Sequence, residues 1–406
     1  MFNMTPSLTD FPMHRIKTML SLALLNFAIF SVQADTVKTG PSLLGAAHQA
    51  MKPNKYTGID SMLVYQQGKL LSEYYYGKFS ANTTHRTHST FKSINALIAL
   101  IAIEQGLLSE QESLFPLLNS LSKQQSKDPQ KSRIRIKDLL NMTSGIACDE
   151  SPGSEGPNHE WALDEGPKPL QYSMEIKMAA EPGSQWHYCN ANSFMLAGAV
   201  SAALIRAGKE DIFSFADKYL MAPLGIKHYR LNRSPNGQYL MGQGNAHFLP
   251  ADLAKFGLLI LNKGKWMNKR IISEQTIKKL YGSKHKINWS FTDTINPRQD
   301  SKTTYSHQWY QTPFDIKGSR VWALHSWGNG GQFIFVVPKL SAVIVFTGSN
   351  QGNFDKQKQP FDVMQQYVLP ELMKISRHTE ISEQLPAVNK TMPTKQLSST
   401  KASDAL

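Results

Sequence analysis

The sequence predicts an α+β fold in which an antiparallel β-sheet, built from both ends of the chain and flanked by helices, carries a largely helical inserted region. Runs typical of strands gather before residue 77 and after residue 318, whereas helix-like apolar runs and loops dominate the stretch from about 89 to 280. A chain of 406 residues with 41% hydrophobic residues can bury a large core, as one unit with a helical subdomain.

The strand-like runs lie in two groups. Residues 62–66 and 70–76 flank a Gln67-Gly68 pair, a pattern typical of a β-hairpin. Three further runs follow near the other end of the chain: 319–325, 333–337 and 342–347. Because the strand-like runs lie at both ends of the chain, with the helical stretch between them, we expect them to form one antiparallel sheet.

The motif Ser89-Thr90-Phe91-Lys92 opens a strongly apolar run that continues to Ile103. One helical turn separates the Ser89 hydroxyl from the Lys92 amine. The run is apolar nearly all round, which indicates a buried helix whose N-terminal end alone reaches a cleft. Burial lowers the pKa of an amine, and first-turn N–H groups favour negative charge on a bound oxygen. The motif therefore predicts Ser89 as a nucleophile with Lys92 as its base.

Ser-x-x-Lys spacing alone is weak evidence, because it occurs three more times. The other pairs are Ser120/Lys123, Ser283/Lys286 and Ser398/Lys401. All three lie in polar, Lys-rich or tail sequence where nothing would bury the lysine, so their ordinary interpretation is a solvated helix or loop. Only the pair that begins at Ser89 leads into a core helix.

A second element, Tyr188-x-Asn190, lies about a hundred residues downstream and precedes an apolar helix-like run. A tyrosine hydroxyl beside a Ser/Lys pair can relay a proton between nucleophile and leaving group. An asparagine amide can orient the lysine and hold a substrate carbonyl. The alternative is a tyrosine that anchors a loop by one hydrogen bond.

The third element has the sequence SWGNGGQ over residues 326–332, between two of the strand-like runs. Glycines that interrupt a strand mark a close approach of backbone. If that approach is to a substrate, the N–H of Asn329 would join that of Ser89 in binding an oxyanion. The alternative is a tight bend or bulge.

In this order, and with long gaps between them, Ser89-x-x-Lys92, Tyr188-x-Asn190 and the Gly-rich strand motif resemble the serine β-lactamase and penicillin-binding-protein superfamily. Flanking segments are similar to the branch that holds class C β-lactamase-like esterases and 6-aminohexanoate-dimer hydrolases. These segments are 136–145, 250–257 and 331–338. The resemblance runs from about residue 57 to about 372.

The resemblance implies a β-lactamase/transpeptidase-like fold and a cofactor-free serine hydrolase. It implies that Ser89 is the acylated nucleophile, Lys92 its base and Tyr188 the proton relay. Asn190 would be a partner in the same network.

The third motif departs from the family pattern. Where β-lactamases and carboxypeptidases carry Lys-Thr-Gly, this chain has Ser326-Trp327-Gly328. The lysine that would hold a substrate carboxylate is missing, and His325 is a partial substitute because a histidine is mostly neutral at pH 7. We therefore expect an esterase or amidase whose less charged pocket is lined by Trp327. Ser326, Trp327, Gly328 and Asn329 are its candidate substrate and oxyanion contacts.

The N-terminal segment is typical of a signal peptide. Arg15 and Lys17 precede an apolar run at 19–30, and Ser31-Val32-Gln33 lead up to Ala34. We expect cleavage after Ala34 and a periplasmic or secreted protein, with an uncleaved membrane anchor as the alternative. The predicted organisation is a signal peptide at 1–34, a β-lactamase-related serine hydrolase domain at 35–375 and a disordered polar tail at 376–406.

The chain has two cysteines, Cys148 and Cys189. Export makes them candidates for a disulfide, which would pin the Tyr188 loop to the segment after Gly145. Two free buried thiols are the alternative.

The net charge of +13 and pI near 9.5 do not predict nucleic-acid binding, because the basic residues are dispersed and no recognition motif is present. Association with an anionic cell envelope is compatible with this charge. The twelve histidines form no metal-binding pattern, so no metal is predicted.

The sequence thus predicts an exported serine hydrolase that cleaves a small-molecule ester, amide or peptide through an acyl-enzyme on Ser89. Two alternatives stay open. One is a β-lactamase or D-alanyl-D-alanine carboxypeptidase, and the other is a catalytically silent homologue that binds peptidoglycan fragments.

Overall fold

The computed structural model describes residues 44–51, 55–122, 128–148, 150, 166, 168–234, 237, 239–282, 285–287 and 303–384. The chain divides into two units, Met1–Pro41 and Ser42–Leu406, and all described residues belong to the second. The predicted signal peptide at 1–34 lies outside the described residues.

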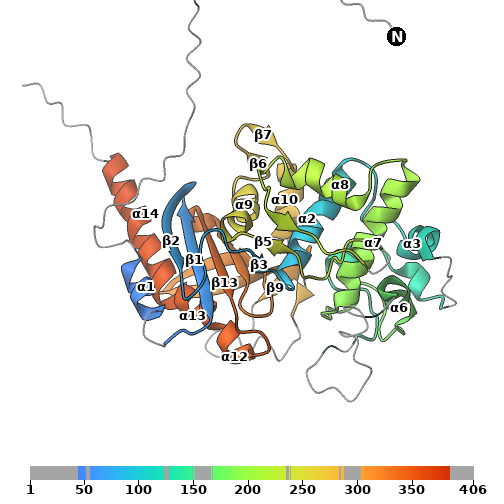
Figure 1. Ribbon diagram of the computed structural model, residues 1–406, viewed down its shortest axis with the longest axis horizontal. Helices are drawn as coiled ribbons and strands as arrows, with labels where there is room; N and C mark the ends of the chain where they lie inside the picture. The colour runs from blue at the N-terminus through green and yellow to red at the C-terminus, as the bar shows by residue number, and fades with distance from the viewer. Residues whose placement is uncertain are drawn as a thin grey trace, which may run out of the picture. The chain divides into compact units, whose positions relative to one another are not determined.

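The main β-sheet draws its strands from both ends of the chain (Figure 1). Its order among the described strands is β2-β1-β13-β12-β11-β10-β9-β8, and every neighbouring pair is antiparallel. The bounds are β1 (Ile59–Gln66), β2 (Lys69–Tyr75), β8 (His285–Lys286), β9 (Thr304–Ser306), β10 (Trp309–Ile316), β11 (Ser319–His325), β12 (Phe333–Val337) and β13 (Ala342–Gly348). The predicted α+β architecture is confirmed.

The N-terminal and C-terminal strands meet at the pairing of β1 with β13, where Val64 lies opposite Ile344. Strand β1 also pairs with β2 across a turn at Gln67 and Gly68, both with positive φ. Two such residues form the tight turn whose twist suits a β-hairpin. The hairpin predicted from 62–66 and 70–76 is confirmed, and β11 and β12 have the predicted bounds.

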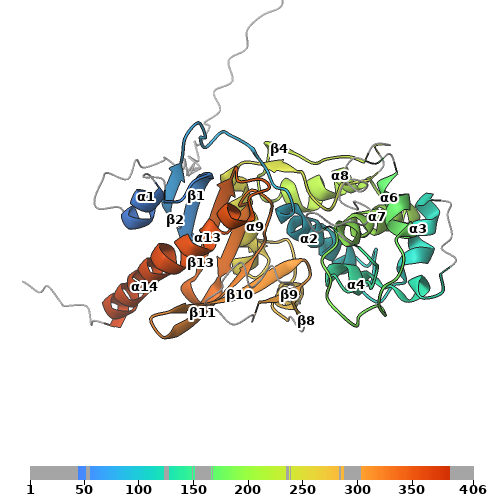
Figure 2. The ribbon, with the colours of Figure 1, turned by 90° about the horizontal axis from the view of Figure 1, so that it is seen from below.

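Helices cover both faces of the sheet (Figure 2). Helix α9 (Pro250–Leu261) packs against β12 and β13 on the side of the larger core. On the other face, side chains of β10, β12 and β13 share a second core with the N-terminal and C-terminal helices. Those helices are α1 (Gly45–Met51), α13 (Gln359–Val363) and α14 (Leu369–Gln384), and the short helix α12 (Phe354–Gln357) precedes α13.

The inserted region is largely helical. Its helices are α2 (Thr90–Glu104), α3 (Leu114–Ser122), α4 (Ile136–Leu140), α6 (Pro169–Glu175), α7 (Asn190–Arg206), α8 (Ile212–Ala216) and α10 (Glu274–Leu280). Helix α2 is buried from Thr90 to Ala102 and packs against α7, as its continuous apolar sequence predicts.

Two small sheets in this region were not predicted. One has the order β3-β5-β4 and the other pairs β6 with β7. Their bounds are β3 (His85–Arg86), β4 (Tyr229–Arg230), β5 (His247–Phe248), β6 (Lys265–Trp266) and β7 (Lys269–Arg270). Two-residue strands are too short to show the alternation that predicts a strand.

At the C-terminal end, α14 runs to Gln384 and so extends past residue 376, the predicted start of the tail. Residues 385–406 lie outside the described residues. None of the described helices combines the length and the apolar composition that a membrane span needs.

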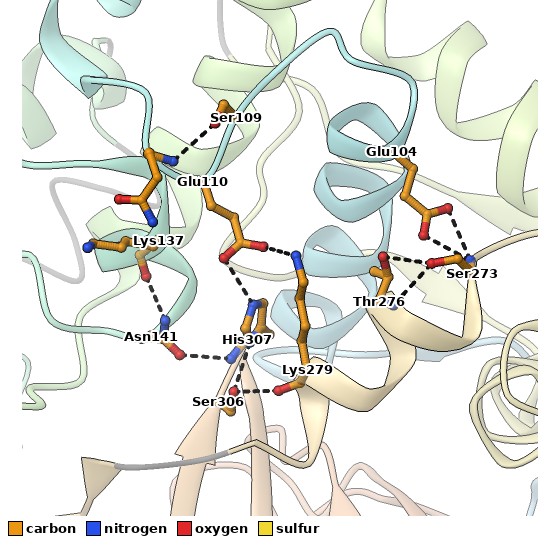
Figure 3. A network of polar contacts seen from close by, with 11 residues as sticks. Glu104, Ser109, Glu110, Lys137, Asn141, Ser273, Thr276, Lys279, Ser306 and His307 are labelled. Carbon is orange, nitrogen blue, oxygen red and sulfur yellow. Dashed lines mark hydrogen bonds and ion pairs between the residues drawn. The ribbon is translucent and has the colours of Figure 1, made fainter.

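A polar network joins the turn between β9 and β10 to the helical region (Figure 3). The Glu110 carboxylate accepts a hydrogen bond from Lys279 Nζ at 2.5 Å and lies 3.7 Å from His307 Nε2. The backbone N–H of His307 donates to Asn141 Oδ1 at 3.2 Å. His307 and Lys279 hold the pKa of Glu110 down at about 2, although burial would raise it.

The next residue, Gln308, lies between three helices. Its carbonyl accepts a hydrogen bond from Ser93 on α2 at 2.6 Å, and its side-chain oxygen accepts one from Ser193 on α7 at 3.0 Å. Its N–H donates to the carbonyl of Leu140 at the end of α4. One turn of the sheet therefore fixes the distance between α2 and α7.

The two cysteines form the Cys148–Cys189 disulfide. Cys189 precedes α7 directly, and Cys148 follows the loop after α4. The N–H of His187 donates to the carbonyl of Met142 at 2.8 Å, which makes a second link between the same two segments. Both links hold the loop that contains Tyr188.

We expect Glu110→Gln to lower the free energy of unfolding by about 2 kcal/mol at pH 7. The folded-state pKa lies below the ordinary value of 4.5, so the carboxylate stabilises the protein above pH 4.5. This contribution disappears as the pH falls from 4.5 toward 2. Urea unfolding at several pH values measures it, with Glu371→Gln as a control because its pair with Lys374 is more exposed. An equal loss at pH 7 and pH 3 would contradict the expectation.

For the disulfide, we expect no titratable thiol in the oxidised protein under denaturing, non-reducing conditions. Because the bridge spans 41 residues of sequence, replacing both cysteines by serine should lower the free energy of unfolding by about 4 kcal/mol. The chain has no other cysteine, so a count of two thiols would show that the bridge does not form.

Candidate active site

The candidate site is built around Ser89, which precedes α2 and is half-buried. Lys92, one turn later, is 2% exposed. Its Nζ lies 2.8 Å from Ser89 Oγ and 2.6 Å from the carbonyl oxygen of Gln243. The helix thus places a buried amine directly beneath a hydroxyl that remains accessible.

Tyr188 reaches the same hydroxyl from the inserted region. Its Oη donates to Ser89 Oγ at 2.8 Å, and Lys92 Nζ lies 5.0 Å from the centre of its ring. The first two sequence motifs therefore converge on one oxygen atom. A hydroxyl held by an amine and a phenol has two nearby groups through which its proton can leave.

Asn190 begins α7, and its backbone N–H donates to Glu150 Oε1 at 2.6 Å. Its side-chain oxygen is buried and has no hydrogen-bond partner among the described residues. That oxygen therefore does not accept a bond from Lys92, as would be needed if it oriented the lysine. It remains available as an acceptor beside Tyr188.

The third motif lies beside the start of α2. Thr90 Oγ1 donates to the carbonyl of Gln332 at 2.8 Å and accepts from Ser326 Oγ at 3.3 Å. Ser326 is fully buried, and its Oγ also accepts the N–H of Ile334. Ser326 thus links the end of β11 to both β12 and α2 through hydrogen bonds, and it offers no exposed group to a substrate.

Gly328 is the residue at which the third motif comes closest to the backbone around Ser89. A Cβ at this position would lie 2.3 Å from the carbonyl oxygen of Thr87 and 3.0 Å from the Thr90 nitrogen, on either side of Ser89. In the part of the chain that the structure describes, the N–H groups of Ser89 and Asn329 donate to no acceptor. Two unpaired donors from the adjoining motifs are what an oxyanion requires.

Trp327 is 6% exposed and packs in the second core, stacked on Phe333 at 5.7 Å and edge-on to Tyr310 at 6.3 Å between ring centres. Its main contacts are thus with the core rather than with an open pocket. His325 is also buried among aromatic rings, and burial lowers its pKa to about 3. It is therefore neutral at pH 7 and supplies no cation.

The carbonyl of Gln243, which accepts the Lys92 hydrogen bond, was not predicted from the sequence. A backbone carbonyl has no residue signature. The glycines on both sides, Gly242 and Gly244, were the available signal, because adding a Cβ to Gly242 would bring it within 2.4 Å of the Ser193 carbonyl oxygen.

We expect Gly328→Ala to slow the labelling of Ser89 by a serine-directed fluorophosphonate at least about tenfold, because the added methyl must displace the backbone on both sides of Ser89. Gly282→Ala is the control, since its methyl would make only ordinary contacts. Labelling rates and circular dichroism are compared for both variants. Equal labelling rates would show that the close approach does not position Ser89.

The geometry can be compared with known proteins. A family model described as Beta-lactamase matches residues 47–367. Among curated proteins no relative matches the chain. Solved structures with the same fold include a Bacillus anthracis protein with the provisional assignment 6-aminohexanoate-dimer hydrolase, which has 20% identity, a TM-score of 0.58 and 80% of each chain covered.

Two other structures are similar at the level of the fold. An octameric penicillin-binding protein homologue from Pyrococcus abyssi has 17% identity and a TM-score of 0.60, with 84% of this chain and 81% of that chain covered. A D-stereospecific amidohydrolase from Streptomyces sp. has 15% identity and a TM-score of 0.58, with 77% and 97% covered. Since the family model spans most of the sequence, the chain belongs to the beta-lactamase family.

Proposed function

We propose that the protein is an exported serine hydrolase that cleaves an ester or amide bond through an acyl-enzyme on Ser89. The observation that carries the proposal is the convergence of Lys92 Nζ and Tyr188 Oη on Ser89 Oγ, each at 2.8 Å. Membership of a family of hydrolases supports it.

In the first step, Ser89 Oγ attacks the substrate carbonyl carbon while its proton passes to Lys92, assisted by Tyr188. Burial disfavours the charged form of an amine, so a buried lysine suits the role of base. The carbonyl oxygen becomes an oxyanion and is stabilised by the N–H groups of Ser89 and Asn329.

In the second step, the tetrahedral intermediate collapses and the bond to the leaving group breaks. Tyr188 donates its proton to the leaving oxygen or nitrogen and regains one from Lys92, and the acyl group remains on Ser89. Water then attacks the acyl-enzyme with the same groups in reversed roles, which releases the acid and restores the serine.

An ester or amide is favoured over a β-lactam or a D-alanyl peptide. Ser326 stands where those enzymes of the family carry a lysine, and its buried side chain is occupied by contacts with Thr90 and Ile334. His325 is neutral and buried. Turnover of nitrocefin at rates above those of simple esters would reverse this preference.

Export is part of the proposal. It is supported by the predicted signal peptide at 1–34 and by the Cys148–Cys189 disulfide, a bond that persists in oxidising compartments. An overall charge of +13 would favour association with an anionic envelope surface.

The test is intact-mass measurement after incubation with a fluorophosphonate. We expect one adduct on the wild type and none on Ser89→Ala, with circular dichroism showing that the variant is folded. Ser184→Ala, which removes an exposed hydroxyl, is the matched control and should label like the wild type. A folded wild type without an adduct, or undiminished ester hydrolysis by Ser89→Ala, would overturn the proposal.

A further inference from the structure

The small sheet β3-β5-β4 places three nitrogen-rich side chains in a row. Arg86 lies opposite His247, and His247 lies opposite Arg230. Side chains at paired positions share one face of a sheet. Arg230 Nη2 lies 3.1 Å from His247 Nδ1, and both arginines are exposed. We call Arg86, His247 and Arg230 the cationic row.

The other face of the same sheet holds His85, Phe248 and Tyr229. The nearby acidic groups are bonded to that face. Asp60 lies 3.5 Å from His85, and Asp217 accepts a hydrogen bond from Tyr229 Oη at 2.6 Å. The alternation of the strands thus separates the carboxylates from the cationic row.

No carboxylate among the described residues pairs with Arg86 or Arg230. Arg86 Nε donates instead to the neutral Asn245 Oδ1 at 2.7 Å. Burial, followed by the charges of Arg230 and Arg86, lowers the pKa of His247. Two guanidinium groups therefore face solvent together without a counter-charge, an arrangement suited to an anion.

The cationic row lies close to the nucleophile. Arg86 precedes Ser89 by three residues, a span of at most about 10 Å between Cα atoms. The segment 243–245 joins the two sites, because the Gln243 carbonyl accepts from Lys92 while Asn245 holds Arg86. Next to Ser89, His88 has its pKa lowered to about 4 by burial first and then by Arg86, Lys92 and His247.

We propose that the cationic row binds a carboxylate of the substrate, so that the enzyme prefers esters or amides that carry a free carboxylate on a chain long enough to reach Arg86. This inference rests on the proposed function and names its substrate class. Guanidinium groups bind carboxylates through paired, charge-assisted hydrogen bonds. The row thereby supplies, from a different element, the positive charge that Ser326 does not provide.

The test compares two substrates that differ by one charge. These are the mono-4-nitrophenyl ester of suberic acid, which has a free carboxylate, and its methyl ester, which is neutral. We expect the wild type to prefer the anion, and the ratio of kcat/KM values to fall about tenfold in Arg86→Gln and in Arg230→Gln. Arg86→Lys should retain part of the preference for the anionic ester, and added salt should reduce that preference in the wild type.

Arg320→Gln is the matched control, because it removes another exposed arginine, which lies on β11 and pairs with Asp315. It should leave the ratio unchanged. An unchanged ratio in both Arg86→Gln and Arg230→Gln would overturn the inference. Continued ester hydrolysis and Ser89 labelling would still support the proposed function in that case. Competition by inorganic phosphate without a preference for the carboxylate ester would also overturn it.

A binding measurement distinguishes failure of the carboxylate site from failure of the proposed hydrolase function. In the Ser89→Ala background, calorimetry with the suberate monoester should give an affinity that Arg86→Gln weakens about tenfold. This result would support the cationic row even if Ser89 proved not to be acylated. Equal affinities in the two proteins would overturn the row as a carboxylate site, whatever the outcome of the labelling experiment.

Discussion

The candidate site depends on keeping the Lys92 amine out of water while the Ser89 hydroxyl one turn away stays partly exposed. A buried amine is costly unless it is hydrogen-bonded. Here the cost is offset by bonds to Ser89 Oγ and the Gln243 carbonyl, and by the face of the Tyr188 ring. Burial of α2 from Thr90 to Ala102 keeps water away from its first turn.

Burying α2 requires the two parts of the fold to be locked together. The sheet contributes Gln308, whose bonds to Ser93 and Ser193 set the separation of α2 and α7. The helical region contributes the loop that ends at Tyr188, tied by the Cys148–Cys189 disulfide. The Ser89–Tyr188 distance is thus determined by contacts outside the site, and its precision reflects the rigidity of both parts.

The sequence allowed the fold class, the β1–β2 hairpin and the bounds of β11 and β12 to be predicted, because their alternation and turn residues are local signals. It did not reveal the cationic row, since Arg86, His247 and Arg230 come together only through pairing of two-residue strands. The burial of Trp327 was missed for a related reason. Whether the residue after a strand faces the core or solvent depends on the side chains that the fold brings beside it. For Trp327 these are Phe333 and Tyr310, which lie on other strands.

Ser326, the position at which the resemblance predicts a lysine, has a packing role. Its hydroxyl joins β11 to the N–H of Ile334 and to Thr90, the residue that follows Ser89, and it is fully buried. The Ser326 side chain thus points at the start of α2, which Gly328 also approaches closely, and not at solvent. Charge for an anionic substrate therefore has to come from an element that is close to Ser89 and open to solvent. The exposed face of β3-β5-β4 meets both conditions, because Arg86 precedes Ser89 by three residues and both arginines are exposed. Its acidic neighbours are bonded to the opposite face, so they do not cancel this charge.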